Sequence, residues 1–215
     1  MKRNGLWITN LLIAVVGTAF TSSVVLAQGE GHKQTEKLVK RAEDTMKKVE
    51  ETRQQLQKTI MIYNSIIDGS AEDAKKAYNN LSKAVENCQK QAEDTRKRTE
   101  SMEQEAHNFF AEWTASLEGI GSEDLRKRSQ DRLNETRLSY GEILRAGRSA
   151  RAEFDTFIEE LHDQIVYLGY DLNPSAVASL KEDATKLNQH ADTLFDKIDD
   201  VVKVTTEYIK SIQPQ

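Results

Sequence analysis

The sequence predicts an all-α protein, an elongated antiparallel up-down-up-down bundle of four coiled-coil helices. The first observation is a long stretch, 71–118, whose apolar and small residues recur in alternating steps of four and three. This spacing averages about 3.5 residues, which keeps one stripe of a helix facing a partner helix in a left-handed supercoil. The second observation is that three other stretches carry the same pattern and are separated by short turns. Because short turns make successive helices alternate in direction, the four segments are expected to pack side by side.

The N-terminus, residues 1–27, has the features of a secretory signal peptide. Lys2 and Arg3 precede an apolar run, and small residues before Gln28 allow cleavage after Ala27. The alternative is an uncleaved membrane anchor, but Asn10 interrupts a run that is shorter than the ~20 apolar residues of a transmembrane helix. We therefore predict a periplasmic protein that contacts the membrane only through this segment, and only if it is uncleaved.

Charge and cysteine content exclude several classes of function. The net charge is -5, which argues against nucleic-acid binding because phosphates require a basic surface. Cys88 is the sole cysteine, so the chain forms no internal disulfide. It falls on the apolar stripe of the second helix, and residues 87–92 offer no base to activate it. We therefore expect Cys88 to be a packed apolar residue.

The first helix is expected at 33–67, after a polar lead-in, 28–32, and it begins a single bundle domain, 33–213. Its stripe comprises Val39, Ala42, Met46, Val49, Arg53, Leu56, Ile60, Tyr63 and Ile67. Arg53 is the charged member, and such a residue usually fixes the register or extends to a carboxylate at the rim. Gly69 can adopt the left-handed conformation that ends a helix, and Ser70 is expected to cap the next one.

The second helix, 71–118, carries the aromatic residues that we consider the candidate contact for a partner. Its stripe comprises Ala74, Tyr78, Leu81, Val85, Cys88, Ala92, Thr95, Thr99, Met102, Ala106, Phe109 and Trp113. Because the second and third helices look longer than the other two, their shared turn is expected to overhang the bundle. Phe109, Phe110, Trp113 and Ile120 lie in that overhang. They are either covered as ordinary core, the arrangement we favour, or partly exposed as a partner contact.

The third and fourth helices complete the expected bundle. The third, 123–168, is capped by Ser122, and Gly147 on its stripe indicates close approach of a neighbouring helix or a kink. Its stripe comprises Ser129, Leu133, Thr136, Tyr140, Ile143, Gly147, Ala150, Phe154, Phe157, Leu161, Ile165 and Leu168. Asn173 and Pro174 mark the start of the fourth helix. Its stripe is unbroken and comprises Val177, Leu180, Ala184, Leu187, Ala191, Leu194, Ile198, Val201, Thr205, Tyr208 and Ile212.

The third helix has a basic stretch, 125–151, which an antiparallel fourth helix would neutralise. Folding the fourth helix back is expected to bring four of its aspartates beside three arginines of the third. These residues are Asp192, Asp196, Asp199 and Asp200, and Arg145, Arg148 and Arg151. Such pairs set orientation more than stability. The alternative is that the basic stretch binds an envelope lipid or polymer.

The search for catalytic chemistry finds no constellation and predicts no enzyme, no cofactor and no nucleotide site. Phosphate-binding loops, dinucleotide fingerprints and zinc-protease motifs do not occur in the sequence. Metal sites in bundles use Glu-x-x-His pairs on facing helices, and Glu159 with His162 has this spacing. A metal-binding bundle centred on these two residues is therefore the alternative function.

Several segments resemble one bacterial family of exported coiled-coil proteins that is catalogued as a domain of unknown function (DUF2959-like). The resemblance is carried by segments 38–44, 110–113, 125–129, 133–137 and 172–180, which read LVKRAED, FAEW, LRKRS, LNETR and LNPSAVASL. It implies a helical protein of the Gram-negative envelope and brings no activity or catalytic residue. Together with the heptads, it favours a non-enzymatic envelope scaffold or adaptor. Such a protein would act through contacts with an envelope protein or by self-association.

Overall fold

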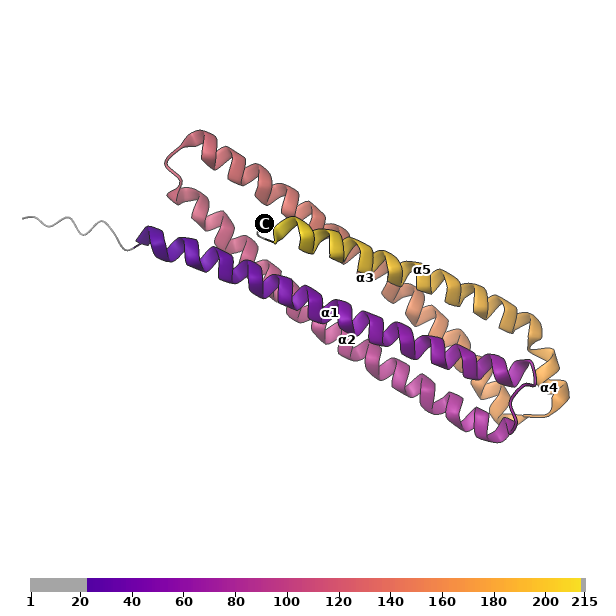
Figure 1. Cartoon of the computed structure of the whole chain (residues 1–215). Helices are drawn as coiled ribbons and strands as arrows, with labels where there is room; N and C mark the ends of the chain where they lie inside the picture. Colours follow the sequence, from indigo (N-terminus) through magenta and orange to yellow (C-terminus); the bar gives the residue numbers. More distant parts are fainter. Residues whose placement is uncertain (1–22, 214–215) are drawn as a thin grey trace, which may run out of the picture.

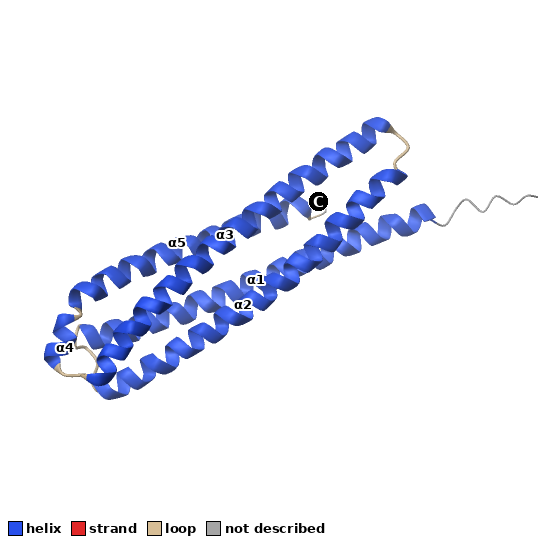
Figure 2. Ribbon diagram, turned by 180° about the vertical axis from the view of Figure 1, so that it is seen from behind, coloured by secondary structure: helices blue, strands red, loops and turns tan. Residues whose placement is uncertain are grey.

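The computed structural model describes residues 23–213 of the chain, with side chains from residue 31 onward. Its helices are α1 (Ser23–Ile67), α2 (Ala74–Ser116), the 3-10 turn η1 (Leu117–Gly119), α3 (Glu123–Tyr170), α4 (Pro174–Ser179) and α5 (Lys181–Ile212). Figure 2 shows only helices and short loops over the described residues, so the all-α prediction is confirmed. Residues 1–22, most of the predicted signal peptide, lie outside the described residues.

The long helices run back and forth along one axis (Figure 1). Helix α1 packs most extensively on α2, and α3 packs most extensively on α5. Contact between α1 and α5 joins these two pairs, whereas α2 and α3 touch each other least among the neighbouring long helices. The molecule is therefore an elongated helical bundle built from two helix pairs.

Helix α1 begins at Ser23, ten residues before the predicted start at Lys33, because the glycines of the lead-in do not interrupt it. Its buried face also includes residues that the predicted stripe left out, namely Leu38, Thr45, Thr52, Thr59 and Ile66. Each buried threonine donates its hydroxyl hydrogen to the carbonyl four residues earlier, at 2.8–2.9 Å. A threonine can occupy an apolar seam in this way because its polar group is satisfied within its own helix.

The turn between α1 and α2 corrects the predicted start of the second helix. Gly69 has the positive φ, 76°, that was expected of it. However, α2 begins at Ala74 rather than Ala71, and its cap is Asp73 rather than Ser70. The carboxylate of Asp73 accepts a hydrogen bond from the Lys76 backbone N–H at 2.9 Å, while the Ser70 N–H donates to Asp68 instead. The aspartate therefore satisfies an N–H that the first turn of a helix leaves free.

The fourth predicted helix is two helices, because the chain breaks at Leu180. The start is as expected, with the Asn173 side chain accepting hydrogen bonds from the N–H groups of Ser175 and Ala176. The Leu180 N–H then bonds to the Val177 carbonyl at 3.2 Å, which closes a tight final turn of α4 before α5 starts. Leu180 and Ala176 are both buried. The break thus lets α4 cover the end of the core, where Figure 1 places it.

The predicted ion pairs between α3 and α5 are wrong. Arg145 pairs with Glu142 and Arg151 with Asp155, both on α3 itself. Asp199 of α5 pairs instead with Arg53 of α1 at 3.1 Å, which confirms that Arg53 extends to a rim carboxylate. The Arg53 guanidinium also lies over the Phe195 ring, 5.3 Å from its centre. Asp199 therefore pairs across the α1–α5 interface, which the sequence pattern did not indicate.

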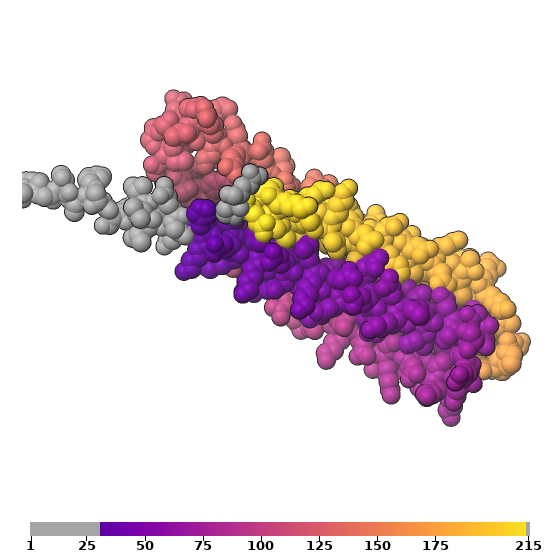
Figure 3. Space-filling model, viewed as in Figure 1, coloured from indigo at the N-terminus to yellow at the C-terminus, as the bar shows by residue number. Residues whose placement is uncertain are grey.

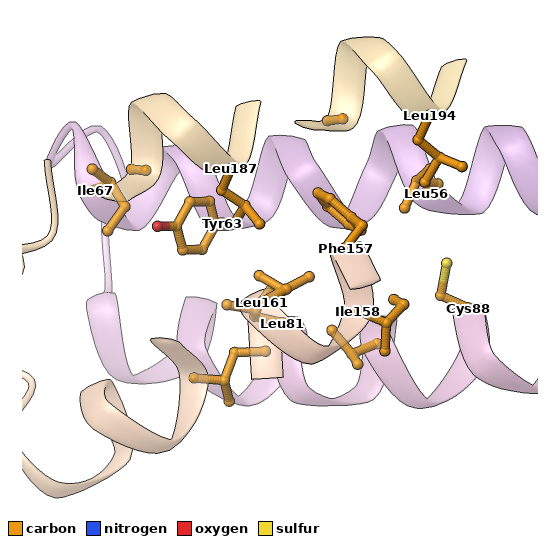
Figure 4. Packing of buried hydrophobic residues seen from close by; sticks show 14 of the residues in the cluster. Leu56, Tyr63, Ile67, Leu81, Cys88, Phe157, Ile158, Leu161, Leu187 and Leu194 are labelled. Atoms are coloured by element: carbon orange, nitrogen blue, oxygen red, sulfur yellow. The ribbon is translucent and has the colours of Figure 1, made fainter. Parts of the chain in front are cut away.

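The buried side chains form two hydrophobic clusters, one toward each end of the bundle. The larger cluster lies beside the α1–α2 and α3–α4 turns and contains Leu56, Tyr63, Leu81, Cys88, Phe157, Ile158, Leu161, Leu187 and Leu194 (Figure 4). The smaller cluster contains Leu38, Val39, Ala42, Met102, Ala106, Phe109, Tyr140, Ile143, Tyr208 and Ile209. Cys88 is fully buried in the larger cluster, so its predicted packing role is confirmed. The two clusters leave a less densely packed middle section.

Candidate functional site

The turn between α2 and α3 forms a tip that projects beyond the C-terminal end of α5, with the start of α1 alongside α2. Figure 3 shows this tip standing apart from the end of α5. Nearly all side chains of residues 123–132 are exposed. Trp113 Nε1 of α2 donates a hydrogen bond to Ser129 Oγ in this segment at 3.0 Å, and Leu133 is the first fully buried side chain of α3. The overhang that the helix lengths predicted is therefore a hairpin tip.

The four candidate contact residues are covered to different degrees. Phe109 is only 6% exposed and packs its ring against the rings of Phe110 and Trp113, at 5.3 and 5.5 Å. Phe110, Trp113 and Ile120 are partly buried. The covered arrangement that we favoured is therefore right for Phe109, while the other three residues keep part of their surface accessible. A role in partner contact stays a prediction for all four.

The tip also exposes Leu125, which was not among the predicted contact residues. Leu125 is 56% exposed, near Ile120 at the start of α3. Its exposure could have been predicted from the sequence, since a leucine that lies off the heptad stripe of a helix has no partner inside the bundle. We use the name tip surface for Phe110, Trp113, Ile120 and Leu125, which, unlike the buried Phe109, keep part of their surface accessible.

The alternative metal site at Glu159 and His162 is not formed. Both residues are exposed, and the nearest acidic partner of the His162 ring is its neighbour Asp163, at 3.9 Å. Among residues 31–213, no group of three or more His, Cys, Asp or Glu residues could hold a metal ion. The closer histidine contact joins His190 Nδ1 to Glu160 Oε2 at 2.5 Å. The Glu-x-x-His spacing does not create a metal site here, because both residues fall outside the buried stripe of α3.

The middle of the bundle contains a cavity of about 350 Å³ between the two hydrophobic clusters. All four long helices line it. Its uncharged lining residues are Thr45, Met46, Val49, Thr52, Ala92, Thr95, Thr99, Met102, Ile143, Leu144, Gly147, Ala150, Phe154, Leu194, Ile198, Val201 and Thr205. A Cβ atom added to Gly147 would meet nothing within 4 Å, so neither a close helix approach nor a crowded kink explains this glycine. Small residues at stripe positions of α2 and α3 instead leave space between these helices.

Charged side chains surround the opening of this cavity between α2 and α3. Arg96, Glu100 and Glu103 of α2 lie on one side, and Arg148 and Arg151 of α3 lie on the other. Arg96 and Arg151 both pair with Asp155, at 2.7 and 3.7 Å. Arg148 forms no ion pair with any residue that the structure describes. The heptad pattern does not predict this cavity, because it marks a position as part of the stripe whatever the size of the side chain there.

Comparison with known proteins places the chain in a family. The family model of DUF2959, described as a protein of unknown function, matches residues 27–212. The chain belongs to the DUF2959 family. The resemblance seen in the sequence is thereby confirmed at the level of the family. No curated protein and no solved structure matches the chain.

Burial governs the ionisable groups inside this DUF2959 bundle. Burial raises the pKa of the Cys88 thiol to about 12, so the thiol stays protonated at neutral pH and is a poor nucleophile. Burial also raises the pKa of the Tyr63, Tyr140 and Tyr208 hydroxyls above the ordinary tyrosine range. Among the described helices, none is long and apolar enough to cross a membrane. The interior of this DUF2959 protein thus offers packing and a cavity rather than activated groups.

Proposed function

We propose that the protein is a non-enzymatic scaffold or adaptor of the cell envelope that acts through protein contacts at its tip surface. The single observation that carries this proposal is the α2–α3 tip, which projects beyond α5 and exposes Leu125 and part of Ile120. Binding energy at protein interfaces concentrates in a few side chains, often aromatic ones such as Trp, and exposed apolar surface marks a contact site. The tip surface offers such side chains at the end of an elongated bundle, which suits a molecule that spans a distance.

Export and the envelope location are part of this proposal. The basic and apolar N-terminus with small residues before Gln28 supports export. The family match begins at residue 27, next to the predicted cleavage point. Partners are an envelope protein or a second copy of this chain, and no nucleic acid or nucleotide is involved.

The test compares crosslinking from two exposed apolar positions in living cells. A photoreactive amino acid replaces Leu125 at the tip in one variant, and Met61 of α1 in the control. Met61 is 71% exposed and lies toward the opposite end of the bundle. We expect a discrete adduct from position 125 and none from position 61. An adduct of twice the chain mass indicates self-association, and any other discrete mass indicates a partner protein.

A second pair of variants separates contact from folding. Leu125→Glu combined with Ile120→Glu should abolish the adduct from a photoreactive residue at Ser122, because the charges oppose burial at an interface. Met61→Glu should leave the adduct in place. Circular dichroism checks that all variants keep their helical content. The proposal fails if position 125 yields no adduct, or if the adduct survives both glutamates.

A further inference from the structure

We propose that the cavity in the middle of the bundle binds the acyl chain of a single-chain amphiphile with an anionic headgroup, such as a fatty acid. The headgroup lies at the arginines of the opening between α2 and α3. This inference does not depend on the tip surface, because it rests on residues in the middle of α2 and α3 and on none of the tip residues.

The size and shape of the cavity fit one extended chain. Its volume, about 350 Å³, lies within the ~300–1,000 Å³ of small-molecule pockets. It is also more than twice the ~150 Å³ of an apolar cavity that accepts benzene. The lining residues extend over 92–103 on α2, 143–154 on α3 and 194–205 on α5. At about 1.5 Å per residue these stretches are roughly 16 Å long, so the cavity follows the bundle axis and suits a linear ligand better than a compact ring.

The lining is apolar even where it contains threonines. Each of five lining threonines donates its hydroxyl hydrogen to the carbonyl four residues earlier in its own helix. These threonines are Thr45, Thr52, Thr95, Thr99 and Thr205. A buried water needs two to four polar partners, and these hydroxyls can only accept from it, because their hydrogens go to backbone carbonyls or, for Thr52 and Thr95, lie between two hydroxyl oxygens 3.0 Å apart. The remaining surface is mostly aliphatic and includes Met46 and Met102, whose unbranched side chains adapt to irregular ligands.

The charges at the opening favour a negative headgroup at one end. Helices α2 and α3 run in opposite directions (Figure 1). Arg96 of α2 and Arg151 of α3 lie close together because both pair with Asp155, and Glu103 lies further along α2. The arginines therefore gather at the end where Arg96 and Arg151 share Asp155 and Arg96 also pairs with Glu93, while Glu100 and Glu103 lie toward the other end. Arg148 stands between them, with no ion pair to a described residue. A guanidinium presents two parallel N–H donors that match a carboxylate or a phosphate.

The experiment measures binding of dodecanoate to the purified, delipidated protein by isothermal titration calorimetry, below the concentration at which micelles form. We expect saturable binding of one dodecanoate per chain, and weaker binding of shorter alkanoates because each buried methylene adds to the affinity. Dodecyltrimethylammonium, with the same chain and the opposite charge, should bind at least roughly tenfold more weakly. Absence of saturable binding overturns the proposal. Equal affinity for the two head groups overturns the assignment of the arginine end.

Variants locate the ligand within the molecule. Gly147→Leu and Ala150→Leu each fill part of the cavity and should weaken dodecanoate binding roughly tenfold or more. Gly141→Leu is the matched control, since Gly141 lies on the same helix, does not line the cavity and has no neighbour within 4 Å of an added Cβ. Arg148→Glu should also weaken binding, and circular dichroism verifies the fold of each variant. If Gly141→Leu weakens binding as much as both filling variants, the site is elsewhere and the proposal is wrong.

Discussion

Two glycines of α3 show how a single residue acts in opposite ways according to what lies beside it. A Cβ atom at Gly169 would lie 2.5 Å from the Tyr78 hydroxyl oxygen and 3.4 Å from the ring carbon that carries it. Gly147 has nothing within 4 Å at the same position because it borders the cavity. Because both glycines lie on the same helix, a difference in stability between their variants reflects the side chains next to each glycine.

Gly147→Ala is expected to raise the free energy of unfolding by roughly 0.5–1 kcal/mol, because alanine has the higher helix propensity and meets no neighbour. Gly169→Ala should give no increase or a decrease, because Tyr78 must move to make room. Urea unfolding followed by circular dichroism measures both. Equal gains from the two substitutions would contradict the contact between Gly169 and Tyr78.

The Cys88 thiol links burial to the dependence of stability on pH. Its pKa is raised from 9.0 to about 12, so the folded state holds a proton that the unfolded state releases. Below pH 9 the thiol is protonated in both states, so the fold keeps its full stability. As the pH rises from 9 toward 12, the unfolded state releases the proton and the free energy of unfolding falls. We therefore expect the urea midpoint to fall between pH 9 and pH 11, and to fall less in Cys88→Ala. Native protein at pH 8 should also resist a thiol-specific reagent that reacts readily in urea. Rapid modification of the native protein would show that the thiol is accessible.

At the scale of the elements, the helices are aligned by a few polar contacts within an otherwise apolar interface. Asn64 of α1 and Asn188 of α5 exchange two hydrogen bonds, at 2.9 and 3.0 Å, each amide nitrogen donating to the other's oxygen. Both side chains are partly buried. A reciprocal pair of this kind is satisfied at one relative position of the two helices, so it fixes their register as a buried asparagine does in a coiled coil.

Asn188→Leu is expected to lower the free energy of unfolding by about 1–3 kcal/mol, because it leaves the Asn64 amide without its partner. The double variant Asn64→Leu with Asn188→Leu should lose less than the sum of the single variants, since both polar groups are then replaced. A double-mutant cycle by urea unfolding measures the coupling. Strictly additive losses would mean that the two amides do not depend on each other.

For the whole molecule, the number of helices that pack together changes along the axis. Toward the α3–α4 turn the larger cluster joins side chains from α1, α2, α3 and α5. At the opposite end the first residues of α3 extend past α5, and few of their side chains are buried. Local stability follows the number of buried apolar contacts. The bundle is thus expected to be least stable at the tip that carries its candidate contact surface.

Amide hydrogen exchange tests this gradient. Amides of residues 123–132 should exchange at least roughly tenfold faster than those of residues 154–168 on the same helix, because the tip can open without unfolding the core. Mass spectrometry of peptides from the two segments measures the difference. Equal protection of both segments would show that α3 opens as one unit and that the tip is as stable as the core.

The sequence by itself determined the helices, most of their turns and the greater part of the buried stripe. Ser122 and Asn173 cap the helices expected of them, and Gly69 adopts a positive φ. These features follow from backbone hydrogen bonding and side-chain periodicity, which depend on residues a few positions apart. For the same reason Cys88 and Phe109 could be assigned to the core from their positions in the heptads.

Only the tertiary structure decided which neighbours these elements meet. The cap at Asp73, the break at Leu180, the pairing of Arg53 with Asp199 and the cavity beside Gly147 all depend on how far one helix is displaced along another. That displacement is set by contacts between residues far apart in the chain, such as Asn64 and Asn188. The heptad pattern repeats along each helix, so it fits equally well when one helix is shifted by a heptad along another and does not specify the displacement. The sequence pattern could therefore place a stripe on each helix, whereas the position of the tip and of the cavity required the assembled bundle.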